Sequence, residues 1–225
     1  MPRMLRAGLA LYLGLCAAVG WAQNPGASVS AQLIAAAEAG NTPRVLQLLA
    51  AGAAVNAQDA RGRTAVLAAT HANKPETVAA LVKAGADVNL RDNRLDNPFL
   101  YAGAEGLLEV LKALEPAKPS TRILNRFGGT ALIPACERGH VEVVRYLLER
   151  TDVDVNYVNN LGWTGLLEAV ILSDGGPRHQ QIVRLLLEHG ANPGLADRDG
   201  VTPLQHAQRR GYSEIARLLR AAGAR

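Results

Sequence analysis

The apolar residues of this chain occur in short groups whose spacing fits helices. In the segment that begins near residue 130, two such groups flank Gly139: Leu132, Ile133 and Ala135 before it, and Val141, Val144, Leu147 and Leu148 after it. The second group repeats at the interval of one helix face. Gly is the usual residue where a helix ends in a left-handed conformation. The segment therefore predicts a helix, a turn and a second helix.

The same pattern occurs six times. Its copies begin near residues 31, 64, 97, 130, 164 and 202, which are 33, 33, 33, 34 and 38 residues apart. Turn sequences with Asp or Asn before Gly lie at residues 59–62, 159–162 and 197–200, and these residue types favour tight reversals. A lone helix pair cannot bury its apolar face, but stacked pairs can. We therefore expect an all-α solenoid of about six helix-turn-helix units with short β-hairpin-like loops, which we call fingers.

Four motifs mark the repeat: Gly200-x-Thr202-Pro203-Leu204, Gly139-His140, Val144-x-x-Leu147-Leu148 and Gly85-Ala86-Asp87-Val88-Asn89. In these motifs the repeat resembles that of the ankyrin family, and the resemblance covers roughly residues 30–225. The family's His after Pro-Leu is absent from every copy, which predicts a thinner polar network between repeats. The third unit is eroded, with Leu95 for the turn Gly, and Pro116 and Pro119 are expected to shorten its second helix. Residues 173–177, Ser-Asp-Gly-Gly-Pro, have the composition of a loop, and we expect them to form a flexible insertion.

The first 22 residues have the three parts of a secretory signal. Arg3 and Arg6 give a positive start, residues 7–20 are uncharged and apolar, and Gly20-Trp21-Ala22 offers a small-x-small cleavage site. We expect a cleaved signal over 1–22, a short linker over 23–29 and the repeat domain over 30–225. A membrane anchor that is never cleaved is the alternative. After cleavage Cys136 is the sole Cys, so no intramolecular disulfide can form.

No sequence motif points to catalysis or to a cofactor. The five His residues have no metal-ligand spacing, and a nucleophile elbow, a phosphate-binding loop and paired carboxylates on one helix are all missing. Cys136 is expected to be buried and inert. Loss of Arg3 and Arg6 lowers the net charge from +4 to +2, which argues against nucleic-acid binding. The mildly basic last helix pair, with Arg209, Arg210 and Arg217, is expected to be a solvated end, with an acidic partner there as the alternative.

The resemblance implies that a partner protein docks on the concave side, which the fingers and first helices line. The chief contact positions fall by register on Arg61, Arg63, Arg91, Arg94, Arg126, Phe127, Val158, Asn160, Leu161, Trp163 and Arg198. First-helix positions include His71 and Glu137. Phe127 and Trp163 stand out because aromatic and Arg side chains dominate interface energies. The competing interpretation is that both rings pack sideways onto a neighbouring finger and stiffen the stack.

These observations and the resemblance predict a non-catalytic protein-protein interaction module that is exported. The organisation resembles that of exported ankyrin proteins of Gram-negative bacteria, which implies the periplasm or secretion. We expect no cofactor, no metal, no membrane insertion after signal cleavage and a monomer. An inhibitor or immunity-type protein that occludes an enzyme would use the same surface, and so would a support factor for an envelope enzyme. The scaffold itself does not identify the partner, because function lies in the residues placed on it.

Overall fold

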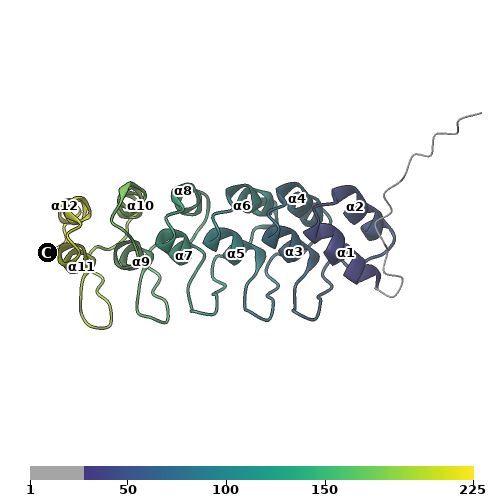
Figure 1. Cartoon of the computed structure of the whole chain (residues 1–225), viewed down its shortest axis with the longest axis horizontal. Helices are drawn as coiled ribbons and strands as arrows, with labels where there is room; N and C mark the ends of the chain where they lie inside the picture. The colour runs from purple at the N-terminus through teal and green to yellow at the C-terminus, as the bar shows by residue number, and fades with distance from the viewer. Residues whose placement is uncertain (1–27) are drawn as a thin grey trace, which may run out of the picture.

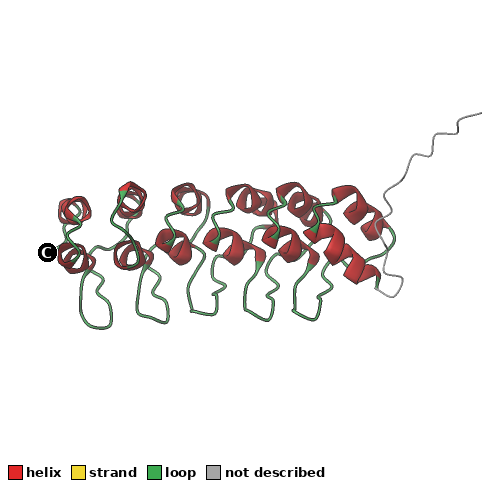
Figure 2. Ribbon diagram, in the orientation of Figure 1, coloured by secondary structure: helices red, strands yellow, loops and turns green. Residues whose placement is uncertain are grey.

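The computed structural model describes residues 28–225, which form twelve α-helices, one short 3-10 helix and no β-strand within that range (Figure 2). The α-helices are α1 (Val29–Glu38), α2 (Thr42–Ala50), α3 (Ala65–His71), α4 (Pro75–Lys83), α5 (Pro98–Ala104), α6 (Leu108–Leu114), α7 (Leu132–Glu137), α8 (Val141–Arg150), α9 (Gly165–Ile171), α10 (Pro177–Glu188), α11 (Pro203–Arg209) and α12 (Ser213–Ala221). The expected signal and residues 23–27 of the linker lie outside the described residues. Helix α1 begins at Val29, just before the expected domain start.

The helices form two rows, and each odd-numbered helix pairs with the even-numbered helix that follows it. The odd-numbered helices pack on one another in one row and the even-numbered helices in the other (Figure 1). The array runs from α1 and α2, in purple, to α11 and α12, in yellow. The fingers project from the odd-numbered row on the side away from the even-numbered helices. This arrangement confirms the prediction of an all-α solenoid of six helix-turn-helix units.

Most odd-numbered helices begin at a capping side chain. Thr64 and Thr164 each accept a hydrogen bond from the backbone N–H three residues on, and Asn97 does the same with the N–H of Leu100 at 2.8 Å. Asn97 therefore keeps the cap although it replaces the usual Thr. Thr130 departs from this pattern, because α7 begins two residues later and the buried Thr130 hydroxyl has no partner among residues 28–225.

The apolar faces predicted from the sequence meet between the two rows. Leu33, Leu81, Leu111, Leu147 and Leu186 are among the side chains that are fully buried in this core. The eroded third unit is confirmed in its details: α6 ends at Leu114, a 3-10 turn follows over Glu115–Ala117, and Lys118 has a φ of 50°. No helix within the described part of the chain has the length and apolarity needed to cross a membrane.

The insertion between α9 and α10 is packed onto the next repeat, which corrects the expectation of a merely flexible loop. The hydroxyl of Tyr212 donates to the carbonyl oxygen of Ser173 at 2.6 Å. Gly175 lies against the Tyr212 ring so closely that a Cβ there would meet a ring carbon at 2.5 Å. Within the loop, Asp174 accepts a hydrogen bond from the N–H of Gly176. The loop is thus fixed by the residue that directly precedes α12.

Candidate partner-binding surface

The five fingers share one backbone scheme, over residues 59–63, 92–96, 125–129, 159–163 and 197–201. In each, the N–H of the first residue donates to the carbonyl oxygen of the fifth, and the N–H of the fourth donates to the carbonyl oxygen of the first. In the fourth finger these distances are 3.0 Å from Asn159 to Trp163 and 2.9 Å from Gly162 to Asn159. The prediction of hairpin-like fingers is therefore confirmed, although their paired ends are too short to count as strands.

The first side chain of each finger holds the turn from inside. A carboxylate or amide oxygen of this residue accepts hydrogen bonds from the N–H groups of the third and fifth residues. The residues in this role are Asp59, Asp92, Asn125, Asn159 and Asp197. Asp and Asn suit the role because their short side chains reach their own backbone. The same polar groups are therefore not free to meet a partner.

The fourth residue of each finger has a positive φ. Gly62, Gly128, Gly162 and Gly200 adopt it without a Cβ penalty, whereas Leu95 adopts it with a φ of 65°. A side chain in this left-handed conformation costs roughly 1–2 kcal/mol. The apolar side chain of Leu95 is exposed on the second finger.

Neighbouring fingers are hydrogen-bonded to each other. The N–H of Asn93 donates to the carbonyl oxygen of Arg61 at 2.9 Å, and the N–H of Asn160 donates to that of Phe127 at 3.1 Å. Arg91 donates through its guanidinium to the carbonyl oxygen of Leu124, and Arg198 donates to that of Asn160. The fingers thus form a tied row rather than five independent loops.

The structure brings most of the expected contact residues to this row. The side chains of Arg61, Arg91, Arg94, Arg126, Phe127, Val158, Asn160, Leu161 and Arg198 are exposed. Trp163 is half-buried, so it is less available than the expectation of a solvent-facing ring required. Contact with a partner stays a prediction for each of these residues.

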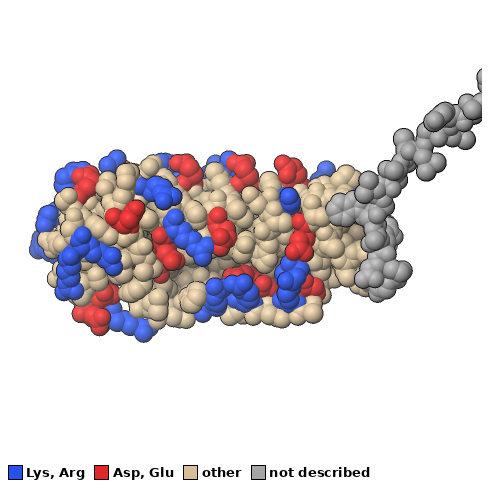
Figure 3. Space-filling view, in the orientation of Figure 1, with Lys and Arg blue, Asp and Glu red and all other residues tan. Residues whose placement is uncertain are grey.

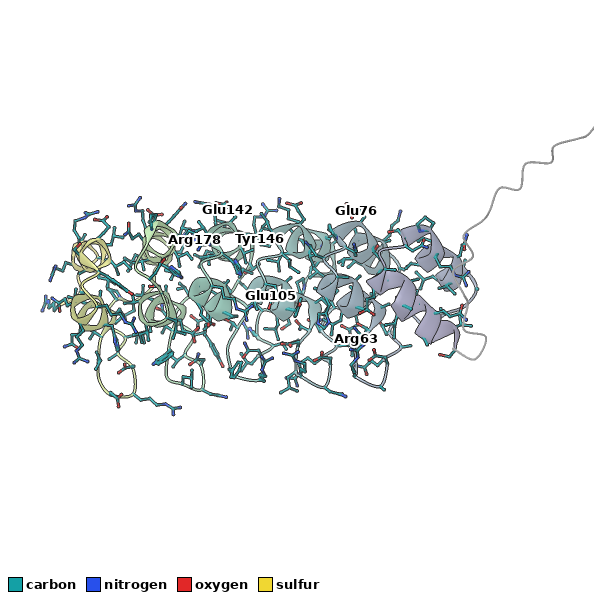
Figure 4. The ribbon with its side chains drawn as sticks, in the orientation of Figure 1. Arg63, Glu76, Glu105, Glu142, Tyr146 and Arg178 are labelled. Atoms are coloured by element: carbon teal, nitrogen blue, oxygen red, sulfur yellow. The ribbon has the colours of Figure 1, made fainter. Side chains whose placement is uncertain are left out.

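Arg63 is placed differently from the expectation. It is 7% exposed and lies where the first finger meets α3 (Figure 4). Its Nε donates to Asp59 Oδ2 at 2.9 Å, and its Nη1 donates to Glu38 Oε1 at 3.1 Å. These contacts connect the first finger to the end of α1, so we assign Arg63 to support of the finger. Sequence register alone cannot show this, because the partner carboxylate Glu38 belongs to the preceding repeat.

Three exposed apolar side chains lie on the adjoining third and fourth fingers and on the residue just before the fourth. They are Phe127, which is 55% exposed, Leu161 and Val158, and we call them the apolar cluster. The guanidinium carbon of Arg126 lies 4.7 Å from the centre of the Phe127 ring, within range of a cation–π contact. In Figure 3 the finger edge below α7 and α9 is largely tan, and blue side chains gather below α3 and α5.

Beneath the fourth finger lies a buried carboxyl that sequence reasoning missed. Glu168 of α9 accepts a hydrogen bond from Asn159 Nδ2 at 2.8 Å. Burial raises the pKa of Glu168 to about 7, and the negative charge of Glu137 adds to this rise, against a lowering by the Asn159 bond. The pair ties the finger holding Leu161 to the first helix of its repeat.

The fifth finger has an equivalent tie with different chemistry. His206 of α11 lies 2.7 Å through Nε2 from Asp197 Oδ2. His206 and Glu168 both follow the capping Thr of their repeat by four residues. This shared sequence position could have identified both as the side chains that support the fingers. The prediction of a thinner polar network is therefore incomplete, because a side chain one residue beyond the family's His supports the turn.

Two aromatic rings lie against each other on α3 and α5. The rings of His71 in α3 and Tyr101 in α5 lie 4.2 Å apart between centres, at 51°. Burial lowers the pKa of His71, whose Nε2 is buried without a hydrogen-bond partner among residues 28–225.

Cys136 is buried as expected, and burial raises its thiol pKa well above the usual value. No group of three His, Cys, Asp or Glu residues placed to hold a metal occurs within residues 28–225.

Comparisons with known proteins agree with this architecture. Residues 33–122, 101–197 and 172–225 match the family described as ankyrin repeats (3 copies). The chain is 46% identical over 197 residues to the protein YahD of Escherichia coli strain K12, an alignment that covers 88% of this chain and 98% of YahD. A crystal structure of an ankyrin repeat domain from Acinetobacter baumannii AYE has a TM-score of 0.84 and 52% identity, with coverage of 86% and 98%.

A second solved structure is more distant in sequence. The ankyrin repeat domain of Bcl-3, described as a unique member of the IkappaB protein family, has a TM-score of 0.78 and 28% identity, covering 89% of this chain and 88% of that domain. The repeat spacing, the paired helices, the shared finger scheme and these matches lead to one conclusion. The chain belongs to the ankyrin-repeat family.

Proposed function

We propose that this chain is an exported, non-catalytic binding module that docks a partner protein on its fingers and odd-numbered helices. Ankyrin repeats are a general protein-protein interaction module. The observation that carries the proposal for this chain is the apolar cluster of Phe127, Val158 and Leu161, which is exposed on fingers that are hydrogen-bonded to each other. Exposed apolar patches of this kind mark interaction sites.

Preorganisation supports the same surface. Asn125 and Asn159 fix the two turns that carry the cluster, and Glu168 ties the second of them to α9. A surface that is already ordered loses little conformational freedom when a partner binds. Export rests on the expected signal at 1–22. We place the protein in the periplasm of a Gram-negative bacterium or outside the cell.

The test is capture of a partner from envelope extract by the purified chain. The variant Phe127→Ala/Val158→Ala/Leu161→Ala removes the cluster without touching the turn-holding residues. The matched control is Val29→Ala/Leu46→Ala, which truncates two exposed apolar side chains of the first repeat. Retention of a protein by the native chain and the control, with loss in the cluster variant, supports the proposal. Equal retention by all three proteins contradicts it.

A further inference from the structure

In each of the first two fingers an arginine is exposed and the neighbouring carboxylate is recessed. In the first finger the side chain of Arg61 is 70% exposed and that of Asp59 is 22% exposed. In the second, the corresponding values are 69% for Arg94 and 13% for Asp96. A partner that approaches these fingers therefore meets guanidinium groups before it meets carboxylates, and this is the edge where blue side chains gather in Figure 3.

The recessed carboxylates are also committed to other groups. Asp59 Oδ1 accepts two backbone hydrogen bonds, and its Oδ2 receives Arg63 Nε at 2.9 Å, whereas Arg61 Nε lies 3.9 Å away. Asp92 is buried and holds the second turn through two backbone N–H groups.

Asp96 is shared between two arginines. It lies 3.9 Å from Arg94 and 3.5 Å from Arg126. Burial and the nearby Asp92 raise the pKa of Asp96. Arg91 donates to a backbone carbonyl oxygen, which carries no full charge. The exposed guanidinium groups of the first three fingers are thus incompletely neutralised within the chain.

The spacing of the fingers sets the spacing of a matching ligand. Packed helices lie about 8–10 Å apart, and the odd-numbered helices carry one finger each. A segment in the extended polyproline II conformation advances about 3.1 Å per residue and has three residues per turn, so every third side chain lies on the same face. About three residues of an extended segment therefore span the step from one finger to the next.

We propose that the fingers bind an extended acidic segment of the partner protein, with a carboxylate at about every third residue facing Arg61, Arg91, Arg94 and Arg126, and an apolar side chain seated on the cluster of Phe127, Val158 and Leu161. This inference rests on the proposed function and adds the chemistry of the partner. A nucleic acid fits less well, because Asp199 is an exposed carboxylate on the fifth finger. In addition, Phe127 is the one aromatic ring classed as exposed on the described fingers, whereas single strands are held by stacking on several aromatic rings.

The probe is a fluorescently labelled peptide of alternating Ser and Gly with Glu at every third position and one central Leu. A second peptide of equal composition carries its Glu residues in one run. Binding of each to the purified full-length chain is followed by anisotropy at about 50 mM salt, where exposed charges are weakly screened. A single-stranded DNA of similar charge is the third ligand.

Two charge-reversal variants separate position from net charge. Arg61→Glu/Arg94→Glu alters the fingers. Lys83→Glu/Arg184→Glu makes the same charge change at exposed positions of α4 and α10. We expect the spaced peptide to bind more tightly than the other two ligands. Its affinity should fall by roughly tenfold or more in the finger variant and by less than about twofold in the control, because exposed pairs act locally.

Three results overturn the inference: no binding of the spaced peptide, equal binding of the clustered peptide or the DNA, or equal loss in both variants. These failures differ from failure of the proposed function. If envelope capture still depends on the cluster of Phe127, Val158 and Leu161 while the spaced peptide fails, the fingers bind a partner of another chemistry. If capture is independent of the cluster, the proposed function itself falls.

Discussion

Replacement of Glu168 by Gln is expected to stabilise the chain at alkaline pH by far more than at about pH 5. Gln is close to Glu in shape, and its carbonyl oxygen accepts the hydrogen bond that Asn159 Nδ2 donates at 2.8 Å. The substitution therefore keeps the tie between the fourth finger and α9. It removes only the possibility of ionisation in a buried position.

The magnitude follows from the pKa. Glu168 has a pKa of about 7 in the folded chain, against 4.5 for the unperturbed side chain. As pH rises between these values, the unfolded chain loses the proton first, so the folded chain binds more protons and its stability falls. At about 1.4 kcal/mol per pKa unit, the loss amounts to about 3 kcal/mol above the higher value. The glutamine side chain of the variant has no proton to lose at this position, so the variant avoids this loss.

Urea unfolding at about pH 5 and pH 8 measures the effect. At the higher pH, the midpoint of Glu168→Gln should exceed that of the native chain by roughly 1 M urea, with an unchanged slope. Glu76→Gln, at an exposed position in the first turn of α4, makes the same change outside the core, is the matched control and should not stabilise the chain at pH 8. A difference between Glu168→Gln and the native chain that is the same at both pH values would refute the reasoning.

Three further predictions concern stability and reactivity. Gly128→Ala should destabilise the chain by about 2 kcal/mol in urea unfolding, because φ is 69° and the new Cβ would collide with the Asn160 side chain. The control Gly223→Ala, where φ is 94° and no atom lies within 4 Å of the new Cβ, should destabilise the chain less. Equal destabilisation by the two substitutions would show that the contact with Asn160 does not matter. Tyr212→Phe should lose about 1 kcal/mol and speed proteolysis at residues 173–176, whose anchor is the Tyr212 hydroxyl; an unchanged cleavage rate contradicts this anchoring role. The Cys136 thiol, buried and with a raised pKa, should react with a thiol reagent only after unfolding, and rapid labelling of the native chain would contradict its burial.

The helix pairs, the six units and the hairpin-like fingers were predictable because each depends on residues close together in the sequence. Gly and Asp or Asn at fixed offsets predict the turns, and the apolar period predicts the buried faces. Exposure within the fingers was less predictable. Arg61 and Arg63 are two residues apart in one finger, yet Arg61 faces solvent and Arg63 is buried against Glu38 of the preceding repeat.

Interactions between side chains of different elements account for the other differences. The register shows that Glu168 lies in a first helix, but its burial against Asn159 and Glu137 depends on how the fourth finger folds back. The sequence at 173–177 predicts a loop, and only the packed array brings Tyr212 to it. Trp163 was expected to face solvent from its register in the repeat, yet the structure leaves it half-buried.

The most direct test of the central claim is amide hydrogen exchange of the chain with and without a partner captured from envelope extract. Docking on the fingers predicts slower exchange in the partner's presence over residues 92–96, 125–129 and 159–163, with little change in α4, α6, α8 and α10. Protection confined to those even-numbered helices, with the fingers unchanged, would contradict the account.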